Sequence, residues 1–175
     1  MKLPRDYLLL GIGVPYSRRS PRRTVTEQLA LRGAMFVSFE HLCAVVADSA
    51  GIGRGSNIFP HAVVSNSARL KSYVLVNYHA SLGHDSSAGD FAVMSPYATL
   101  GGGASIGEAA FLGLHASVGH GRAIGARSKV SASSCTLSEA PPDSIAYRVP
   151  GRIVPRAEPG LSCRGLHEGF YAAVP

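Results

Sequence analysis

The feature that constrains this chain most is an apolar residue at every sixth position from Val46 to Val130, with no step out of register. An α-helix repeats at about 3.6 residues and a strand at about 2, so neither explains a strict period of six. The fifteen positions are Val46, Ile52, Ile58, Val64, Leu70, Val76, Leu82, Ala88, Met94, Leu100, Ile106, Leu112, Val118, Ile124 and Val130.

A second column, four residues after the first, consists of small side chains. Every member from Ala50 to Ser134 is Ala or Ser, except Val74 and Arg122. A bulky inward residue alternating with a small corner residue predicts a triangular solenoid, in which each hexad supplies one flat side and one tight corner. Three hexads make a coil of 18 residues. Residues 46–135 therefore predict about five coils, stacked about 4.8 Å apart by β-ladder bonds.

This pattern resembles that of the hexapeptide-repeat acyltransferases, whose coils wind left-handedly, against the usual right-handed crossover rule. The resemblance implies an all-β fold, a left-handed parallel β-helix over residues 46–136. Residues 137–175 are expected to form a C-terminal extension, because the periodicity stops at Pro141 and Pro142.

Residues 1–45 are expected to form a small βαβ element before the solenoid. Its predicted parts are a strand at Tyr7–Val14, a helix at Thr24–Arg32 and a strand at Ala34–Phe39. One such unit is too small to form a nucleotide-binding domain by itself.

Composition bounds the class of protein and its compartment. No window reaches the ~18 uninterrupted apolar residues of a membrane helix. The apolar start lacks a clean small-residue cleavage site, so a buried strand is expected there rather than a signal peptide. Cys43, Cys135 and Cys163 are an odd number without a CxxC pair. They predict free thiols in a reducing cytoplasm.

A net charge of +6 and a pI near 9.5 favour an anionic partner. The densest basic run contains Arg18, Arg19, Arg22 and Arg23. Such a run is either a solvated loop or a site for the phosphates of a nucleotide or of CoA. No basic stripe with interleaved aromatic residues supports nucleic acid as the partner.

Reactive side chains concentrate in residues 76–85. His84 comes two positions after the inward Leu82, so its side chain is expected outside the prism. Residues 18 apart lie above one another, which places Gly102, within a run of three glycines, one coil above His84. An outward imidazole beside bare backbone N–H groups supplies a general base and an oxyanion donor, the minimal parts for acyl transfer. A merely solvated histidine is the alternative.

The segment from Asn77 to Gly113 resembles the sialic acid O-acetyltransferase (NeuD-like) family and its bacterial sugar N-acetyltransferase relatives. Those proteins carry an Asn, a His–acid pair seven residues on, and a Gly-Asp/Glu-Phe step. Here these are Asn77, His84-Asp85 and Gly89-Asp90-Phe91. The resemblance extends over about residues 7–154.

The resemblance implies an acetyl-CoA-dependent acetyltransferase that acts on a hydroxyl or amine of a sugar or nucleotide-linked sugar, in polysaccharide or glycoconjugate synthesis. It implies direct transfer, with neither an acyl-enzyme nor a required metal. His84 would be the general base, oriented by Asp85. Asn77 would help to position the imidazole, and the backbone N–H of Gly102 would stabilise the oxyanion.

The resemblance further implies a homotrimer, without membrane insertion, that binds CoA in the cleft between subunits along the later coils. The cofactor-binding residues expected from it are Gly102, Gly103, Gly113, Leu114, Ala132, Pro150 and Arg152. Residues 148–152 resemble the family's Gly-x-Pro-Ala-basic ending, from which Arg148 and Gly151 depart.

Two departures concern the acceptor. The family opens with a glycine-rich strand-to-helix loop in a complete nucleotide-sugar-binding subdomain. Gly11-Ile12-Gly13 is not that loop, because no third glycine opens a helix, so a truncated N-terminal subdomain is expected. Some relatives also place a His nine residues beyond the catalytic one, where this chain has Val93.

A second class of function rests on His79, His115 and His120, whose separations of 36 and 5 residues are those of the zinc ligands in γ-class carbonic anhydrases, which share this fold. Three histidines would leave one position of a tetrahedral zinc open for water. Each histidine here lies one position later in its hexad than in that family. Asn57 and Phe59 replace the family's arginine and aspartate.

A third class of function is a non-catalytic trimeric scaffold. In that case, and in the transferase, His61, His79, Tyr97 and His115, which recur at intervals of 18, would form a stacked column lining the subunit cleft.

Overall fold

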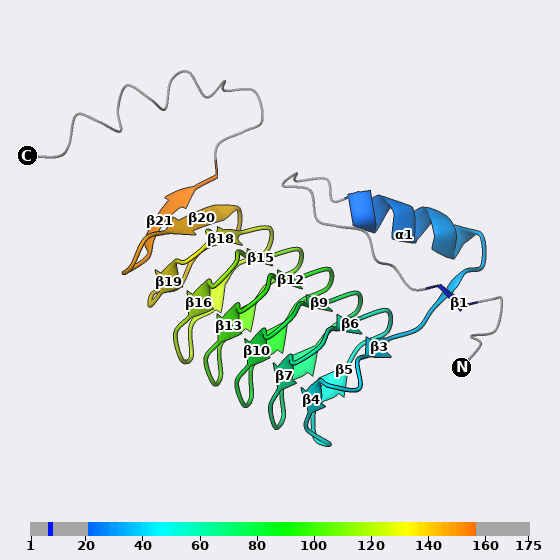
Figure 1. Ribbon diagram of the computed structural model, residues 1–175. Helices are drawn as coiled ribbons and strands as arrows, with labels where there is room; N and C mark the ends of the chain where they lie inside the picture. Colours follow the sequence, from blue (N-terminus) through cyan, green and yellow to red (C-terminus); the bar gives the residue numbers. More distant parts are fainter. Residues whose placement is uncertain (1–6, 9–20, 157–175) are drawn as a thin grey trace, which may run out of the picture.

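The computed structural model describes residues 7–8 and 21–156, and its main body is a three-sided prism of stacked coils (Figure 1). The first face contains β3 (Phe39–Glu40), β6 (Asn57–Ile58), β9 (Leu75–Val76), β12 (Val93–Met94), β15 (Phe111–Leu112), β18 (Lys129–Val130), β20 (Ser144–Tyr147) and β21 (Arg152–Pro155). The second face contains β4 (Val45–Val46), β7 (Val63–Val64), β10 (Ser81–Leu82), β13 (Thr99–Leu100), β16 (Ser117–Val118) and β19 (Cys135–Thr136). The third face contains β5 (Gly51–Ile52), β8 (Arg69–Leu70), β11 (Ser87–Ala88), β14 (Ser105–Ile106) and β17 (Ala123–Ile124).

Each coil contributes one strand to each face, and successive coils pair in parallel with an offset of 18 residues. Leu82, for example, pairs with Val64 on one side and with Leu100 on the other. We call the turns that follow the first, second and third faces the first, second and third edges. Because the offset is constant, the same position of every coil lies on the same edge.

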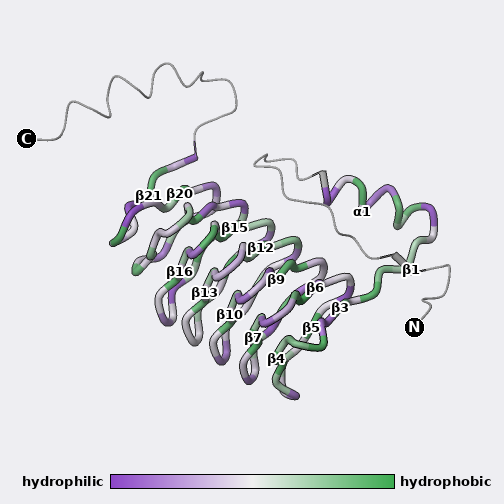
Figure 2. The backbone as a smooth tube through the Cα atoms, viewed as in Figure 1, coloured by the Kyte–Doolittle hydropathy of each residue, from purple (hydrophilic) through white to green (hydrophobic). Residues whose placement is uncertain are grey.

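The interior of the prism is the apolar column that the sequence predicted. Every member from Ile58 to Val130 is at most 4% exposed. The small column is buried with it at the corners, from Ser56 to Ser134, apart from the exposed Arg122. The coils in Figure 2 accordingly alternate between apolar and polar residues along each side. Burying aliphatic side chains in this way is the main favourable contribution to folding.

The stack extends beyond the apolar column at its N-terminal end. There β3 pairs with β6, one hexad before the predicted start at Val46. The apolar pattern does not predict this coil, because the exposed Glu40 occupies the position that is apolar in the other coils. Terminal repeats tolerate such a residue, since no further coil covers them.

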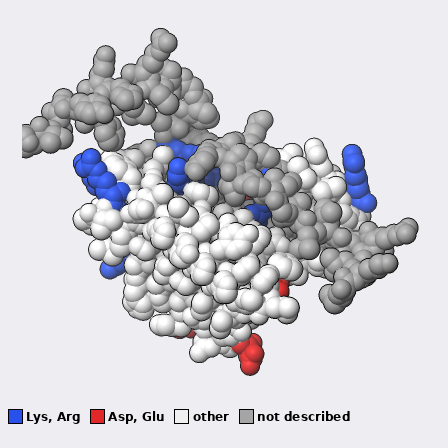
Figure 3. Space-filling model, in the orientation of Figure 1, with Lys and Arg blue, Asp and Glu red and all other residues white. Residues whose placement is uncertain are grey.

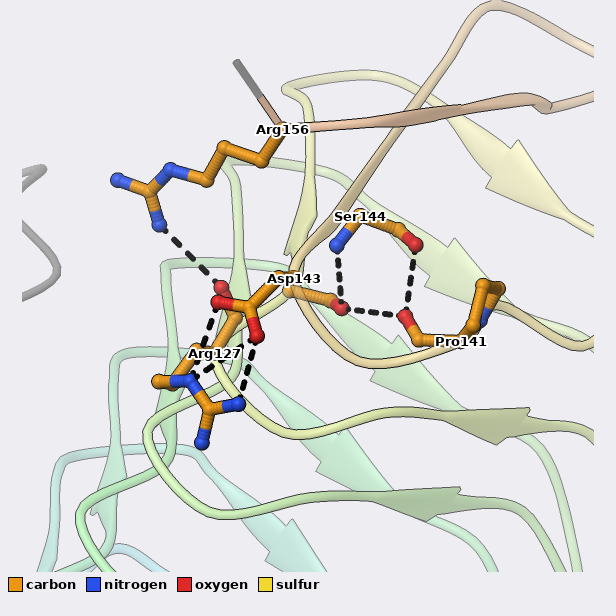
Figure 4. A network of polar contacts seen from close by, with 6 residues as sticks. Arg127, Pro141, Asp143, Ser144 and Arg156 are labelled. Carbon is orange, nitrogen blue, oxygen red and sulfur yellow. Dashed lines mark hydrogen bonds and ion pairs between the residues drawn. The ribbon is translucent and has the colours of Figure 1, made fainter. Parts of the chain in front are cut away.

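At the C-terminal end β20 adds to β18, and β21 folds back on β20 as an antiparallel hairpin. Polar contacts join the last coil to the residues around the C-terminal hairpin (Figure 4). Arg127 forms an ion pair with Asp143 at 2.6 Å, and the hydroxyl of Ser144 donates to the carbonyl of Pro141 at 2.7 Å. Within the expected C-terminal extension, residues 144–155 therefore add to the end of the first face.

The N-terminal element contains two parallel strands, β1 (Tyr7–Leu8) and β2 (Met35–Phe36), and one helix, α1 (Pro21–Leu31). The predicted first strand continues into residues 9–14, which lie outside the described residues. The helix begins three residues before the predicted Thr24, because proline suits the first helical position. It ends near Gly33, whose φ of 82° suits a residue without a side chain.

Arginines of the basic run fasten α1 to the third edge. Arg22 is 3% exposed, and its guanidinium lies 5.8 Å from the ring centroid of Phe91. Burial lowers the pKa of Arg22 to about 10. Arg23 bonds Glu27 at 2.8 Å and also pairs with Glu108. These two residues thus have a structural role, whereas Arg18 and Arg19 lie outside the described residues.

Two further expectations concern the cysteines and a membrane-spanning helix. Cys43 and Cys135 are free thiols, and Cys163 lies outside the described residues. Within residues 7–8 and 21–156, the single helix is too short and too polar to cross a membrane.

The corner column gives a test of the packing account. Ala98 is fully buried, and Ala98→Leu adds three carbons to a closed corner, which is expected to lower the free energy of unfolding by about 1–3 kcal/mol. Arg122→Ala is the matched control. It gives an exposed corner the residue type of the other corners, so a change within about 0.5 kcal/mol is expected. Urea denaturation measures both, and equal losses would contradict the account.

Candidate active site

The second edge carries the histidine and glycines on which the sequence analysis centred. His84 and Asp85 lie in the turn between β10 and β11, and Gly102 and Gly103 lie in the next turn, between β13 and β14. Asp85 and Gly103 adopt left-handed backbone conformations, with φ of 57° and 66°. These turns take the chain around a corner of the prism, from the second face to the third, and leave the imidazole of His84 outside it.

Asp85 holds the imidazole through one contact. Nδ1 of His84 lies 2.9 Å from Oδ2 of Asp85. Because a carboxylate only accepts hydrogen bonds, the neutral ring carries its proton on Nδ1 and has its free lone pair on Nε2. The two side chains are 63% and 68% exposed, so the pair contributes little to stability. Its effect is to present Nε2 as a proton acceptor.

Nε2 of His84 occupies the space that a side chain at position 102 would fill. A Cβ atom added to Gly102 would overlap Nε2, and it would lie 2.8 Å from Cε1 and 2.9 Å from Cδ2 of the same ring. Side-chain atoms do not pack so closely, and the site therefore requires glycine here. The imidazole rests against bare backbone.

The backbone N–H of Gly102 is available to a ligand. Gly101 and Gly103 donate to the carbonyl oxygens of Val118 and His84, at 2.9 and 2.8 Å, whereas the Gly102 N–H donates to none of the described residues. Several other coils have an open N–H at this turn position. This turn differs from them because a glycine, an open N–H and an imidazole nitrogen coincide. Together they form the donor and the base that acyl transfer needs.

Asn77 lies at the first edge, one hexad before the turn of His84. Its Oδ1 accepts a hydrogen bond from the N–H of the adjacent Tyr78 at 2.9 Å. Asparagine commonly closes turns in this way. Within one chain the structure does not bring Asn77 to His84.

The residues expected to bind the cofactor divide between two edges. Gly102 and Gly103 lie at the second edge beside His84, whereas Gly113, Leu114 and Ala132 lie at the first edge. Leu114 is 47% exposed, and the backbone of Gly113 packs directly on that of Ala132. The two sets are separated by the second face.

Pro150 and Arg152 belong to the C-terminal hairpin of β20 and β21. Both are exposed, and Arg152 pairs with Tyr147 across the hairpin. They lie at the same end of the stack as the later coils, toward which the expected CoA path runs.

The predicted aromatic column is present along the first edge. The ring centroids of His61 and His79 are 4.9 Å apart, those of His79 and Tyr97 4.7 Å, and those of Tyr97 and His115 4.7 Å. Adjacent rings are within 14° of parallel. Tyr97 thus separates His79 from His115.

His120, the third residue of the alternative metal set, lies at the second edge instead. Within one chain the three histidines do not converge. Among the described residues, moreover, no group of three or more His, Cys, Asp or Glu side chains is placed to hold a metal ion.

His120 instead lies close to His84. Their ring centroids are 6.1 Å apart and the rings are tilted by 48°. The separation of 36 residues, two full coils, was the signal in the sequence that could have joined these two side chains.

A groove of about 320 Å³ lies on the third face, adjacent to the third edge. Its lining includes Arg69, Lys71, Ser87, Asp90 and Glu108. Arg69 donates to the carbonyl of Ser49 at 2.6 Å. The groove supplies both signs of charge, but none of its lining residues belongs to the second edge that carries His84.

Sugar acetyltransferases are among the solved structures that resemble this chain. A mutant of perosamine N-acetyltransferase from Caulobacter crescentus, in complex with CoA and GDP-perosamine, is 28% identical with a TM-score of 0.74, over 76% of this chain and 63% of that chain. The acetyltransferase domain of PglB from Neisseria gonorrhoeae is 31% identical with a TM-score of 0.74, over 76% of this chain and 65% of that chain. A further structure of this domain contains acetyl coenzyme A.

The fold is that of the left-handed β-helix acetyltransferases. The predicted fold class is thereby confirmed. The chain spans 63–65% of the length of these acetyltransferases. No family model matches the chain, and no curated protein matches its sequence.

The contact between His84 and Gly102 predicts the effect of one methyl group. In Gly102→Ala the new Cβ overlaps Nε2, so the exposed imidazole must swing away while the prism stays folded. We expect a shift of the His84 imidazole signals in NMR spectra and a melting temperature within about 4 °C of the wild type, the shift that about 1 kcal/mol produces in a chain of this size. Ser138→Ala, two coils further along the same edge, should change neither. Unmoved imidazole signals in Gly102→Ala would refute the contact.

Proposed function

We propose that this protein is an acetyl-CoA-dependent acetyltransferase that acetylates an amine or hydroxyl of a sugar or nucleotide-linked sugar, with His84 as general base. The observation that carries the proposal is the placement of His84 Nε2 against Gly102, whose N–H is open. The likeness to sugar acetyltransferases supports the choice of donor and acceptor.

Nε2 of His84 takes the proton from the acceptor nitrogen or oxygen as that atom attacks the thioester carbonyl. Asp85 keeps the lone pair on Nε2 and stabilises the imidazolium that forms. The N–H of Gly102 donates to the carbonyl oxygen as it becomes an oxyanion, which commonly lowers such a barrier by about 3–4 kcal/mol. The tetrahedral intermediate then expels the CoA thiolate, and the proton held by His84 passes to its sulfur.

A homotrimer would join the two separated sets of residues. In one chain the base is at the second edge and Leu114 and Ala132 are at the first edge, so a cleft between subunits can combine the second edge of one with the first edge of its neighbour. The second face between these edges suits contact with another chain. All its outward strand residues are uncharged, namely Val45, Val63, Ser81, Thr99, Ser117 and Cys135. The prism face toward the viewer in Figure 3 likewise has few charged side chains.

The comparisons favour an amine on a nucleotide-linked sugar as the acceptor. Perosamine N-acetyltransferase, solved with GDP-perosamine, acts on an amino sugar. We place this reaction in the cytoplasm, where polysaccharide precursors are activated as nucleotides.

The two other classes of function receive less support. For a carbonic-anhydrase-like enzyme, His79 and His115 are held apart by Tyr97 in one stack. A non-catalytic scaffold would not require a glycine beneath an oriented imidazole.

Calorimetry with acetyl-CoA, on the wild type and on His84→Ala, tests the proposal together with a metal assay of the same samples. We expect both proteins to bind with a Kd in the micromolar range. With GDP-perosamine as acceptor probe, we expect kcat to fall by about 10²–10⁴-fold in His84→Ala, the usual contribution of a general base. Asp85→Asn should retain binding and lose less activity than His84→Ala.

The outcome separates the three classes. An absence of CoA binding, with near-stoichiometric zinc or iron that is lost in His115→Ala, would replace the transferase by a metalloenzyme. An absence of both CoA binding and bound metal would favour the non-catalytic scaffold.

A further inference from the structure

His84 and His120 come closer than the geometry of the stack dictates. They are separated by two coils, which amounts to about 9.6 Å between backbones. Their ring centroids are nevertheless only 6.1 Å apart. The His84 ring, which lies over Gly102, therefore reaches across the intervening coil toward His120.

The absence of a side chain at Gly102 allows the rings of His84 and His120 to come this close. At the first edge, His79 and His115 have the same separation of 36 residues, but Tyr97 stacks between them at 4.7 Å from each. At the second edge the intervening residue has no side chain, and the His84 ring lies in the space that a side chain would fill. Gly102 belongs to the coil between those of His84 and His120, so a thioester carbonyl bound to its N–H would lie close to both rings.

His120 has a hydrogen-bond donor to spare. It is exposed, and none of the described residues accepts or donates a hydrogen bond at its ring nitrogens. Its only close aromatic neighbour in the described chain is His84. Arg122, also exposed, is the nearest charged residue along the chain.

We infer that His120 is a second catalytic residue, which donates an N–H hydrogen bond to the departing sulfur of the acyl donor. The inference rests on the proposed function. The expected CoA path runs along the later coils, through Gly113 and Ala132, and His120 lies on the later-coil side of Gly102. A donor that enters from there places its sulfur toward His120 and leaves the His84 side to the acceptor.

The transfer of the acetyl group from CoA to the acceptor needs no further reagent. The bond from the acceptor to the carbonyl carbon forms and the carbon–sulfur bond breaks, with its electron pair going to sulfur. A His120 N–H stabilises the thiolate as it develops, and the proton that His84 removed from the acceptor ends on the CoA thiol. His120 itself is unchanged at the end.

Three variants test the role of His120, with acetyl-CoA as donor and GDP-perosamine as acceptor probe. His120→Phe keeps a ring of similar size without an N–H, and we expect kcat to fall by about 10- to 100-fold, toward the loss seen when one hydrogen-bond donor to a developing anion is removed. His120→Gln restores an N–H and should bring kcat back to within about 5-fold of the wild type. Ser138→Ala, one coil beyond His120 on the same edge, should match the wild type.

The binding constant for acetyl-CoA, from calorimetry, should stay within about 2-fold in all three variants, because the bond to sulfur forms only in the transition state. A wild-type kcat in His120→Phe, or an equal loss in the Phe and Gln variants, would overturn the inference. If His84→Ala alone abolishes transfer, the proposed function stands without this role for His120. If the wild type transfers no acetyl group, both fail.

Discussion

The whole structure depends on the burial of one aliphatic side chain per hexad inside a three-sided prism. From Ile58 to Val130 these side chains are shielded from water, and each strand pairs with the strands 18 residues before and after it. A slip of one residue would turn the aliphatic column outward, which fixes the register strongly. The small corner residues follow from the same constraint, because a tight turn between flat sides leaves no room for larger ones.

A fixed register makes the outer surface a lattice in which sequence separation determines position. Glycine at position 102 exposes backbone under His84, while tyrosine at position 97 fills the space between His79 and His115 at another edge. The residue type in the intervening coil thus decides whether two histidines 36 residues apart are separated by a stacked ring or come close to each other. Chemistry in such a fold can change without any change in packing.

Most of this could be predicted from the sequence, because a period of six is a long-range signal repeated fifteen times. The same arithmetic placed Gly102 beside His84. The period of six does not predict the structure where the repeat is interrupted. Glu40 breaks the apolar pattern in the first coil, and the C-terminal hairpin follows the prolines at which the pattern ends. The period also could not show that Asn77 bonds its own turn, or that the rings of His84 and His120 come close to each other. Those features depend on side-chain conformation, which periodicity does not encode.

A crystal structure of the protein with acetyl-CoA tests the central claim most directly. The account predicts the thioester carbonyl oxygen about 2.7–3.1 Å from the backbone nitrogen of Gly102, with the pantetheine arm lying along the first edge of a neighbouring subunit past Leu114. Acetyl-CoA bound with its thioester away from the turn of His84 and Gly102 would contradict the assignment of the active site, whatever the rest of the cofactor contacts.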